Sequence, residues 1–241
     1  MSDNSQPTGG KAFPPIQPLY APIKRRAFFM YAGATAGATA LVLAGCSKDN
    51  DPTINTSAGI SLGAGDVGVL NYAYALEQLE AAFYTQVVKT PATDFLPGEL
   101  ATFAQIAAHE GIHRDFLRAA ISAADSGSLL PELTPIFTGI TFSSRASVLG
   151  AAKTFEDLGV AAYNGAGILL KSQSYLIIAG QIVSVEARHA AYVRDLLAPG
   201  SFADDNQVDA NGLDKQLTPV AVIAAAQPFI SQQLDASSVG K

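Results

Sequence analysis

The sequence predicts an all-α protein, a four-helix bundle made of two antiparallel hairpins and followed by a short C-terminal helix. Four segments carry apolar residues at steps of three and four, which is the spacing of one face of a helix. Short connections join the first two segments and the last two, whereas a long connection separates the middle pair. Two tight hairpins joined by one long crossover form a known bundle connectivity. About half of the residues are apolar, at 49%, which is enough to fill one continuous core.

The first hairpin is expected between residues 66 and 124. Apolar side chains such as Val69, Leu70 and Leu76 recur from residue 66 to residue 89 without a proline, which predicts the first helix. Prolines at both ends of residues 91–97 stop that helix, because proline lacks a backbone N–H. The second helix is expected over residues 98–124.

The second hairpin is expected between residues 144 and 197. Its first helix covers residues 144–170, with Ser143 or Ser144 as the N-cap. Its second helix covers residues 174–197 and stops at a proline–glycine pair. Residues 125–142 contain two prolines and two glycines and form the long crossover between the hairpins.

Residues 199–241 are expected to pack on the bundle as a loop and a short helix. The polar residues 201–216 form the loop, and Thr218 with the following proline begins a fifth helix that runs to about Leu234. Pro228 is expected to kink this helix. Its apolar face is expected to cover one end of the bundle.

The first 46 residues indicate an export signal. Basic residues end in the pair Arg25-Arg26, an apolar stretch follows from residue 27 to residue 43, and two small residues precede Cys46. This arrangement resembles a bacterial lipoprotein signal in which cleavage leaves Cys46 as a lipidated amino terminus, and the arginine pair resembles a twin-arginine signal. An uncleaved membrane anchor and an ordinary export leader with incidental arginines remain open.

The export signal predicts where the protein resides. Cys46 is the only cysteine, so a disulfide framework is excluded. Residues 47–65 are rich in small polar residues and are expected to tether the domain flexibly to a membrane. The expected location is the bacterial cell envelope, on the periplasmic side or the cell surface, with the protein held by its N-terminal lipid. The formal charge of −6 is spread along the chain, and the lack of a basic patch argues against nucleic-acid binding.

Two Glu-x-x-His pairs, each preceded by a single glutamate on the previous expected helix, predict a metal site. The chain has seven glutamates and three histidines, so the doubled pattern uses most of them. A spacing of three residues places a carboxylate and an imidazole on one face of a helix. Each pair taken alone could also be an ordinary contact on a helix surface. The six residues are Glu77, Glu110 and His113 in the first hairpin and Glu156, Glu186 and His189 in the second.

Helix lengths and charge both favour two metal ions at this position. In each hairpin the two glutamates lie at similar distances from the connecting turn, so antiparallel packing brings them to one height. Four carboxylates inside a bundle would repel one another, and two divalent cations would neutralise them. Many carboxylates with one imidazole per ion suit iron or manganese, whereas the lack of thiolates argues against a structural zinc site or an iron–sulfur cluster. The sequence does not choose between iron and manganese.

The two hairpins also resemble each other beyond the six residues. Residues 77–84 align with residues 156–163, matching the glutamate, a leucine, an alanine and a terminal tyrosine. Tyr84 and Tyr163 therefore each follow a candidate ligand by two turns and could donate a hydrogen bond to a ligand carboxylate. The alternative is that both are core residues with no such role.

Two further residues lie beside the pattern. Glu80 follows Glu77 by three residues and could be a seventh carboxylate near the metals, although its counterpart in the other hairpin is Gly159. The alternative is a solvated or hydrogen-bonding glutamate. His109 precedes Glu110 and points away along the helix, so it is expected to be a surface or supporting histidine rather than a ligand.

The doubled pattern resembles that of the ferritin-like di-iron and di-manganese carboxylate proteins and covers residues 66–198. Within that group the chain looks most like bacterial ferritin-like domain proteins related to plant desiccation-related proteins. The exported leader and residues 213–220, Leu-Asp-Lys-Gln-Leu-Thr-Pro-Val, carry this similarity. The resemblance implies a ferritin-like four-helix bundle in which all six residues are ligands. It also implies that Glu110 and Glu186 bridge the two ions.

A carboxylate-bridged metal pair predicts redox chemistry with O₂ or peroxide, as in a ferroxidase, a peroxidase or a catalase. The chain has no cysteine-rich segment to deliver electrons, so peroxide reduction would need an external electron donor. A lipid-anchored protein does not suit a closed storage cage, and a homodimer remains open. The alternative is a non-catalytic envelope protein for stress or desiccation, with a structural or vestigial metal site.

Overall fold

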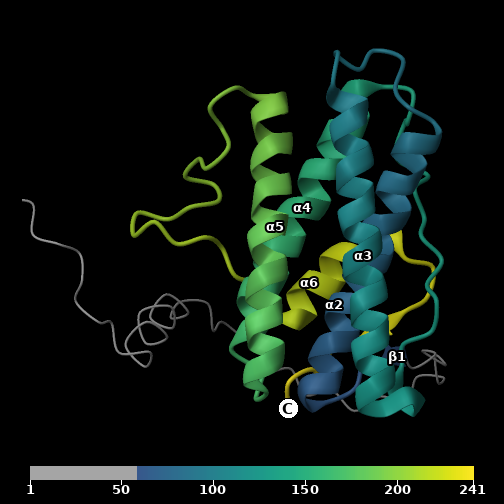
Figure 1. Ribbon diagram of the computed structural model, residues 1–241, viewed down its shortest axis with the longest axis vertical. Coiled ribbons are helices and arrows are strands. Elements are labelled where there is room, and N and C mark those ends of the chain that lie inside the picture. Colours follow the sequence, from purple (N-terminus) through teal and green to yellow (C-terminus); the bar gives the residue numbers. More distant parts are fainter. Residues whose placement is uncertain (1–58) are drawn as a thin grey trace, which may run out of the picture. The chain divides into compact units, whose positions relative to one another are not determined.

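The computed structural model describes residues 59–241 and confirms the all-α bundle. Its four long helices are α2 (Gly65–Lys89), α3 (Glu99–Asp125), α4 (Arg145–Gly167) and α5 (Gln173–Leu197) (Figure 1). The expected export signal, Cys46 and the first part of the expected tether lie outside the described residues. Within the described part of the chain, no helix combines the length and the apolar character needed to cross a membrane.

The helices pair as two hairpins. α2 packs along α3, α4 packs along α5, and the two hairpins meet where α2 contacts α4. The chain passes from α3 to α4 through a short 3₁₀ helix, η1 (Ser126–Ser128), and an extended crossover beside the bundle (Figure 1). This connectivity is the predicted one.

Helix α2 is the most deeply buried element, because other segments cover its outer side. Every residue from Gly68 to Ala81 is buried, whereas α3 and α5 are buried along only one stripe. The Asn71 side chain donates to the carbonyls of Leu62 and Ser128, and Gln78 accepts from the backbone N–H of Leu133. Hydrogen bonds from the buried side-chain amides of α2 therefore hold the crossover and the N-terminal segment against this helix.

The helix ends follow the local sequence. Ser144 caps α4 and Ser172 caps α5, each by accepting a hydrogen bond from a backbone N–H in the first turn. Thr218 caps α6 (Pro219–Ala226) in the same way, with Pro219 in the first turn. The fifth helix is shorter than expected. It changes at Pro228 into a 3₁₀ turn, η2 (Gln227–Phe229), because proline cannot donate the next helical hydrogen bond.

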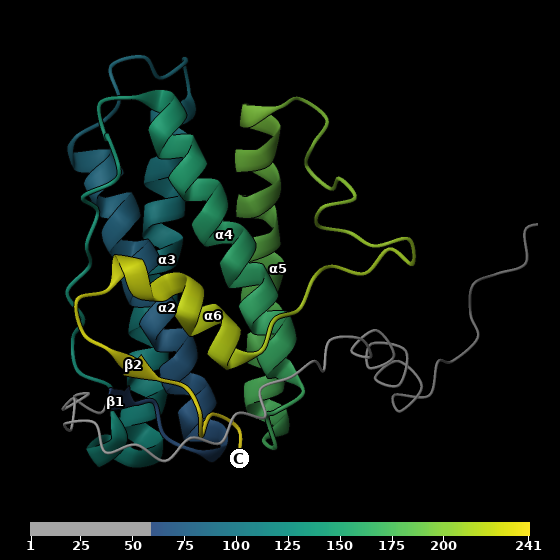
Figure 2. The same cartoon turned by 180° about the vertical axis from the view of Figure 1, so that it is seen from behind.

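Helix α6 lies across the side of the bundle rather than over one end (Figure 2). The backbone N–H of Leu217 donates to the carbonyl of Ala161 in the middle of α4. The Leu217 carbonyl also touches Gly165 so closely that a Cβ at Gly165 would overlap it. Phe229 then packs edge-on against Phe155 of α4. The glycine thus allows the C-terminal segment to reach α4.

The folded part of the chain begins before residue 66. Strand β1 (Ile60–Ser61) pairs in parallel with β2 (Leu234–Asp235), and both strands are only two residues long (Figure 2). Leu62, which follows β1, is fully buried in the core. The sequence predicts a flexible tether that includes residues 59–65, but these residues are part of the folded domain because Leu62 fills an apolar site in the core.

Candidate metal centre

The bundle brings the six predicted side chains together at its centre. Each of the four long helices contributes one glutamate, and the two outer helices, α3 and α5, each add a histidine one turn later. All four of these glutamates have no exposed surface, and the side chains of His113 and His189 are 11% and 6% exposed. Four carboxylates and two imidazoles therefore meet inside the protein.

The six side chains form two overlapping groups, and in each group the candidate ligand atoms lie within 4.8 Å of one another. Glu110 and Glu186 belong to both groups, so they lie between two candidate ion positions. This geometry fits the bridging role that the sequence resemblance implied for them. The first group is Glu77, Glu110, His113 and Glu186, and the second is Glu110, Glu156, Glu186 and His189.

The imidazoles approach the shared glutamates from opposite hairpins. The Nδ1 atom of His113 lies 2.9 Å from Oε1 of Glu186, and Nδ1 of His189 lies 2.8 Å from Oε1 of Glu110. Each histidine is therefore closest to the shared glutamate of the other hairpin. Longer approaches of 3.4 to 3.6 Å join His113 Nδ1 to Glu110 Oε2 and Glu77 Oε2, and His189 Nδ1 to Glu156 Oε2.

These short distances are not aligned hydrogen bonds. Among the described residues, eight buried atoms of the cluster have no hydrogen-bond partner despite their closeness. Buried polar atoms are normally paired, so a group of unpaired atoms needs a physical explanation. Atoms that point to a common centre rather than at one another have the arrangement of metal ligands. They are Glu77 Oε2, both carboxylate oxygens of Glu110 and Glu186, Glu156 Oε2, and Nδ1 of His113 and His189.

Two tyrosines hold the remaining oxygens, and they do so across the hairpins. The Tyr163 hydroxyl of α4 donates to Glu77 Oε1 of α2 over 2.5 Å, and the Tyr84 hydroxyl of α2 donates to Glu156 Oε1 of α4 over 2.5 Å. Each phenol thus binds one carboxylate oxygen and leaves Oε2 directed into the cluster. The interpretation of both tyrosines as plain core residues is wrong, because both hydroxyls bond to a candidate ligand.

Burial and mutual repulsion change the protonation of the carboxylates. Burial raises the pKa of Glu77 to about 7, and burial together with the neighbouring carboxylates raises the pKa of Glu186 well above its ordinary value. Burial also raises the pKa of Glu156. Glu110 differs. Burial would raise its pKa, but the two imidazoles beside it outweigh this and lower the pKa to about 2. Without a metal, the centre therefore retains protons on its carboxylates.

The same contacts keep the imidazoles protonated in the absence of metal. Burial alone would lower their pKa values, but the surrounding carboxylates raise the pKa of His113 to about 12 and that of His189 to about 10. The centre is therefore balanced by protons on nitrogen and oxygen atoms that a metal would displace. A site whose positive charge comes from protons on ligand atoms is chemically suited to exchange them for cations.

Glu80 lies beside the cluster but in neither group. It is only 3% exposed, and the other carboxylates of the centre, added to its burial, raise its pKa well above the ordinary value. A Cβ at Gly159 would lie 3.0 Å from Glu80 Oε1, so the missing side chain at Gly159 leaves room for this carboxylate. Of the alternatives for Glu80, the solvated glutamate is wrong, because Glu80 is buried next to the candidate ligands.

His109 supports one of the two candidate histidine ligands. Its Nδ1 atom lies 3.0 Å from Nε2 of His189, and the planes of the two rings are nearly parallel, at 8°. Nε2 is the nitrogen of His189 that points away from the carboxylates. Sequence reasoning predicted a supporting or surface histidine but not its partner, which lies eighty residues away on α5. At the corresponding position of the second hairpin, the chain has Val185 instead.

A surface hollow of about 290 Å³ reaches the imidazole side of the centre. It lies between α3 and α5, and both candidate histidine ligands form part of its wall. Solvent and small polar molecules can therefore approach the centre from this face. The lining residues are His109, Ile112, His113, Val185, Arg188 and His189.

Comparison with protein families matches a ferritin-like domain model to residues 65–199, more than half of the chain. The chain belongs to the ferritin-like domain family. The match covers all four bundle helices in full and contains every candidate ligand. It therefore confirms the ferritin-like four-helix bundle expected from the sequence. The comparison with curated proteins gave no match. The closer similarity to desiccation-related proteins and the export signal stay predictions.

Proposed function

We propose that the six side chains hold two divalent ions of iron or manganese, with Glu110 and Glu186 bridging them. The observation that supports this most directly is the set of eight buried nitrogen and oxygen atoms that converge without hydrogen bonds among the described residues. Four carboxylates neutralise two divalent ions, and the mixture of oxygen ligands with one imidazole per ion suits iron or manganese.

We further propose that the centre is a redox site for O₂ or peroxide. Two such ions can deliver two electrons together, reducing O₂ to H₂O₂ or H₂O₂ to two waters, with the uptake of two protons in either case. Sustained reduction needs an external electron donor, whereas catalase-like disproportionation of peroxide needs none. The hollow between α3 and α5 favours this proposal over a purely structural site, because it lets small molecules reach the centre.

The chain's own residues have distinct parts in this proposal. Tyr84 and Tyr163 orient the terminal carboxylates by holding one oxygen of each. Glu80 is a buried carboxyl group whose pKa is raised by burial and by the neighbouring carboxylates, and its role in this proposal is to supply a proton next to the reacting molecule. The apolar core of the bundle excludes water on the sides away from the hollow.

Elemental analysis by inductively coupled plasma mass spectrometry tests the metal site. We expect about two iron or manganese ions per chain in the native protein and a loss of metal in the Glu110→Ala, His113→Ala double variant. Glu132→Ala is the matched control, because Glu132 is exposed and lies on the crossover. Metal that is substoichiometric and unaffected by the double variant would contradict the site.

Turnover separates the enzyme from a structural metal protein. We expect metal-loaded protein to consume peroxide or O₂, and we expect His113→Ala or His189→Ala to abolish this activity. Full metal occupancy without turnover of either molecule would instead support the non-catalytic envelope protein with a structural metal site.

We also propose that the protein is exported and held at a membrane by a lipid on Cys46. The support is the residue pattern before Cys46, which lies outside the residues that the structure describes. Cys46→Ala should release the protein from the membrane fraction or stall its processing. An unchanged membrane fraction with an intact leader would identify a transmembrane anchor instead.

A further inference from the structure

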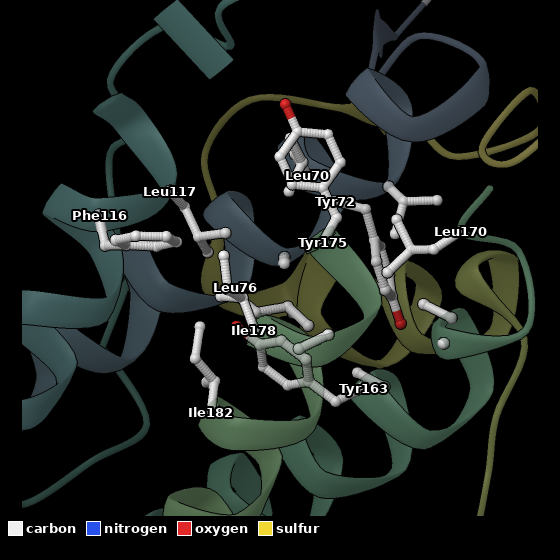
Figure 3. A pocket seen from close by; sticks show the side chains of 16 residues that line it. Leu70, Tyr72, Leu76, Phe116, Leu117, Tyr163, Leu170, Tyr175, Ile178 and Ile182 are labelled. Atoms are coloured by element: carbon white, nitrogen blue, oxygen red, sulfur yellow. The ribbon is translucent and has the colours of Figure 1, made fainter. Parts of the chain in front are cut away.

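A separate cavity of about 30 Å³ lies inside the bundle, between all four long helices (Figure 3). Its wall consists almost entirely of hydrocarbon, supplied by residues such as Leu70, Leu76, Leu117, Ile178 and Ile182. A space of this size could hold a water molecule, which needs roughly 10–15 Å³ by the same measure, but this wall offers water almost no hydrogen-bond partner. Cavities of this kind stay dry and accept small apolar molecules instead.

The cavity shares a wall with the candidate metal centre. Leu76 lines it and immediately precedes Glu77, and Ile182 lines it one helical turn before Glu186. The ring of Tyr163 also lines the cavity, while its hydroxyl donates to Glu77 Oε1 (Figure 3). A molecule in the cavity is therefore separated from the carboxylates only by the side chains of this wall.

The outer part of the cavity wall is also apolar. Phe116 on α3 lines the cavity and is 41% exposed, and Tyr175 and Ile178 on α5 are half-buried. These side chains can move more freely than the buried wall. None of the described residues that line the cavity is charged, so an apolar molecule that enters at this point meets a hydrocarbon wall.

The centre thus has two approaches that differ in the side chains they present. The wall of the hollow between α3 and α5 is largely apolar but includes three histidines and Arg188, whereas the cavity offers almost no polar atom. Peroxide and water lose hydrogen bonds on entering hydrocarbon, which costs them free energy. O₂ has no hydrogen bonds to lose.

We infer that the apolar cavity binds O₂ and delivers it to the metal centre, while peroxide and water use the hollow with the histidines and Arg188. The small volume excludes a lipid chain or another large apolar ligand. The delivery of O₂ rests on the proposed redox function. The binding of a small apolar gas does not, because it depends only on the cavity.

Xenon binding tests the cavity without any metal chemistry. Crystals of the metal-free protein under xenon pressure should show xenon between Leu76, Leu117 and Ile182. Ala166→Leu and Ala179→Leu should remove it, since both alanines line the cavity and a leucine would fill the space. Ala104→Leu is the matched control, because Ala104 is exposed on α3 and does not line the cavity. No xenon at this position in the wild-type protein would overturn the inference.

Rapid mixing tests the delivery of O₂. With the iron(II)-loaded protein, oxidation by O₂ should slow several-fold in the two filled variants, while oxidation by H₂O₂ should keep its wild-type rate. Ala179→Leu guards against misfolding of the buried Ala166→Leu variant, because Ala179 is only half-buried and tolerates a larger side chain more easily. Equal slowing with both oxidants, or with neither, would refute delivery through the cavity. A wild-type protein that binds iron but does not react with O₂ would refute the redox proposal and delivery together, while the xenon result would still decide whether the cavity binds gas.

Discussion

The two hairpins carry the same candidate ligands but different surroundings. Each has a glutamate on its first helix, a Glu-x-x-His pair on its second, and a tyrosine that bonds to the glutamate of the other hairpin. They differ at two positions beside the ligands, where the first hairpin has Glu80 and His109 and the second has Gly159 and Val185. The shared residues are those that a metal pair needs. The residues that are not shared give the two halves of the centre different surroundings.

Glu80 and His109 both belong to the first hairpin, but they act on different parts of the centre. Glu80 lies near the carboxylates and reaches into space that Gly159 leaves open, so one hairpin supplies the group and the other supplies the room. His109 comes from the first hairpin but contacts His189 of the second. Each hairpin is thus completed by the other, and the two candidate ion positions should not be equivalent.

The largest expected effect separates the shared glutamates from the terminal ligands. Glu110→Ala or Glu186→Ala should remove both ions, because each glutamate belongs to both ligand groups. His113→Ala should weaken mainly one ion, since His113 belongs to a single group. Metal counting on all three variants checks this. If Glu110→Ala kept one tightly bound ion, the bridging arrangement would be wrong.

The next effect is a change of stability with pH that metal should reverse. In the metal-free protein, Glu77 has a pKa raised to about 7, and Glu156 and Glu186 are also raised. An acid whose pKa is raised by folding stabilises the fold below its unfolded pKa, and this contribution is lost as pH rises through the folded pKa. The melting temperature of chelated protein should therefore fall between about pH 5 and pH 8.

Metal affinity should rise with pH, because metal ions bind only deprotonated ligands. The melting temperature of metal-loaded protein should therefore exceed that of chelated protein by a growing margin as the pH rises. His113 and His189 add to the loss in the metal-free protein from about pH 6.5 upward, because folding raises their pKa values from that of an ordinary histidine to about 12 and 10. Thermal melts across this pH range, with Glu77→Gln as a variant that lacks one titrating group, check the prediction. Identical melting with and without chelator would show that the site is not loaded.

Sequence reasoning selected the six candidate ligands because their spacing follows directly from helix geometry. Glu110 and His113, or Glu186 and His189, must share a face whatever surrounds them. Contacts that depend on packing between the hairpins could not be predicted in this way. The sequence placed Tyr84 and Tyr163 at the right height but could not show that each bonds across to the other hairpin.

The remaining differences have the same physical origin. Pairing of β1 with β2 joins residues at opposite ends of the domain. A strand of two residues is too short to show an alternating apolar pattern in the sequence. The contact of His109 with His189 depends on the rotation of α3 relative to α5, which periodicity does not determine. Local geometry was therefore predictable, whereas contacts between distant segments required the structure.

A smaller effect should distinguish the two ion positions through His109. If Nδ1 of His189 binds a metal, its Nε2 carries the proton and donates to Nδ1 of His109, which fixes the ring. His109→Ala should weaken binding of the ion next to His189 by about 10–100-fold and spare the other ion. Val185→Ala is the matched control, because Val185 has the corresponding position and lines the same hollow. Titration with manganese(II), monitored by calorimetry, should show two binding steps, and their affinities should differ more in His109→Ala than in the native protein. Equal weakening of both steps would mean that His109 acts only through general packing.

The smallest effect concerns Gly159 and Glu80, and a double-mutant cycle is needed to see it. Alanine is favoured over glycine inside a helix by about 1 kcal/mol, so Gly159→Ala should stabilise α4 if nothing opposes it. In the native protein the new Cβ would lie 3.0 Å from Glu80 Oε1, and moving that carboxylate should cancel much of the gain.

Removing the carboxylate should restore the gain. We expect Gly159→Ala to change the free energy of unfolding little in the native background, but to stabilise the Glu80→Ala background by about 1 kcal/mol. Urea unfolding of the four metal-free proteins at one pH measures the coupling. Equal effects of Gly159→Ala in both backgrounds would show that the glycine does not make room for Glu80. The presence of Glu80 in one hairpin and Gly159 in the other would then need another explanation, because the absence of a side chain at Gly159 would not depend on the Glu80 carboxylate.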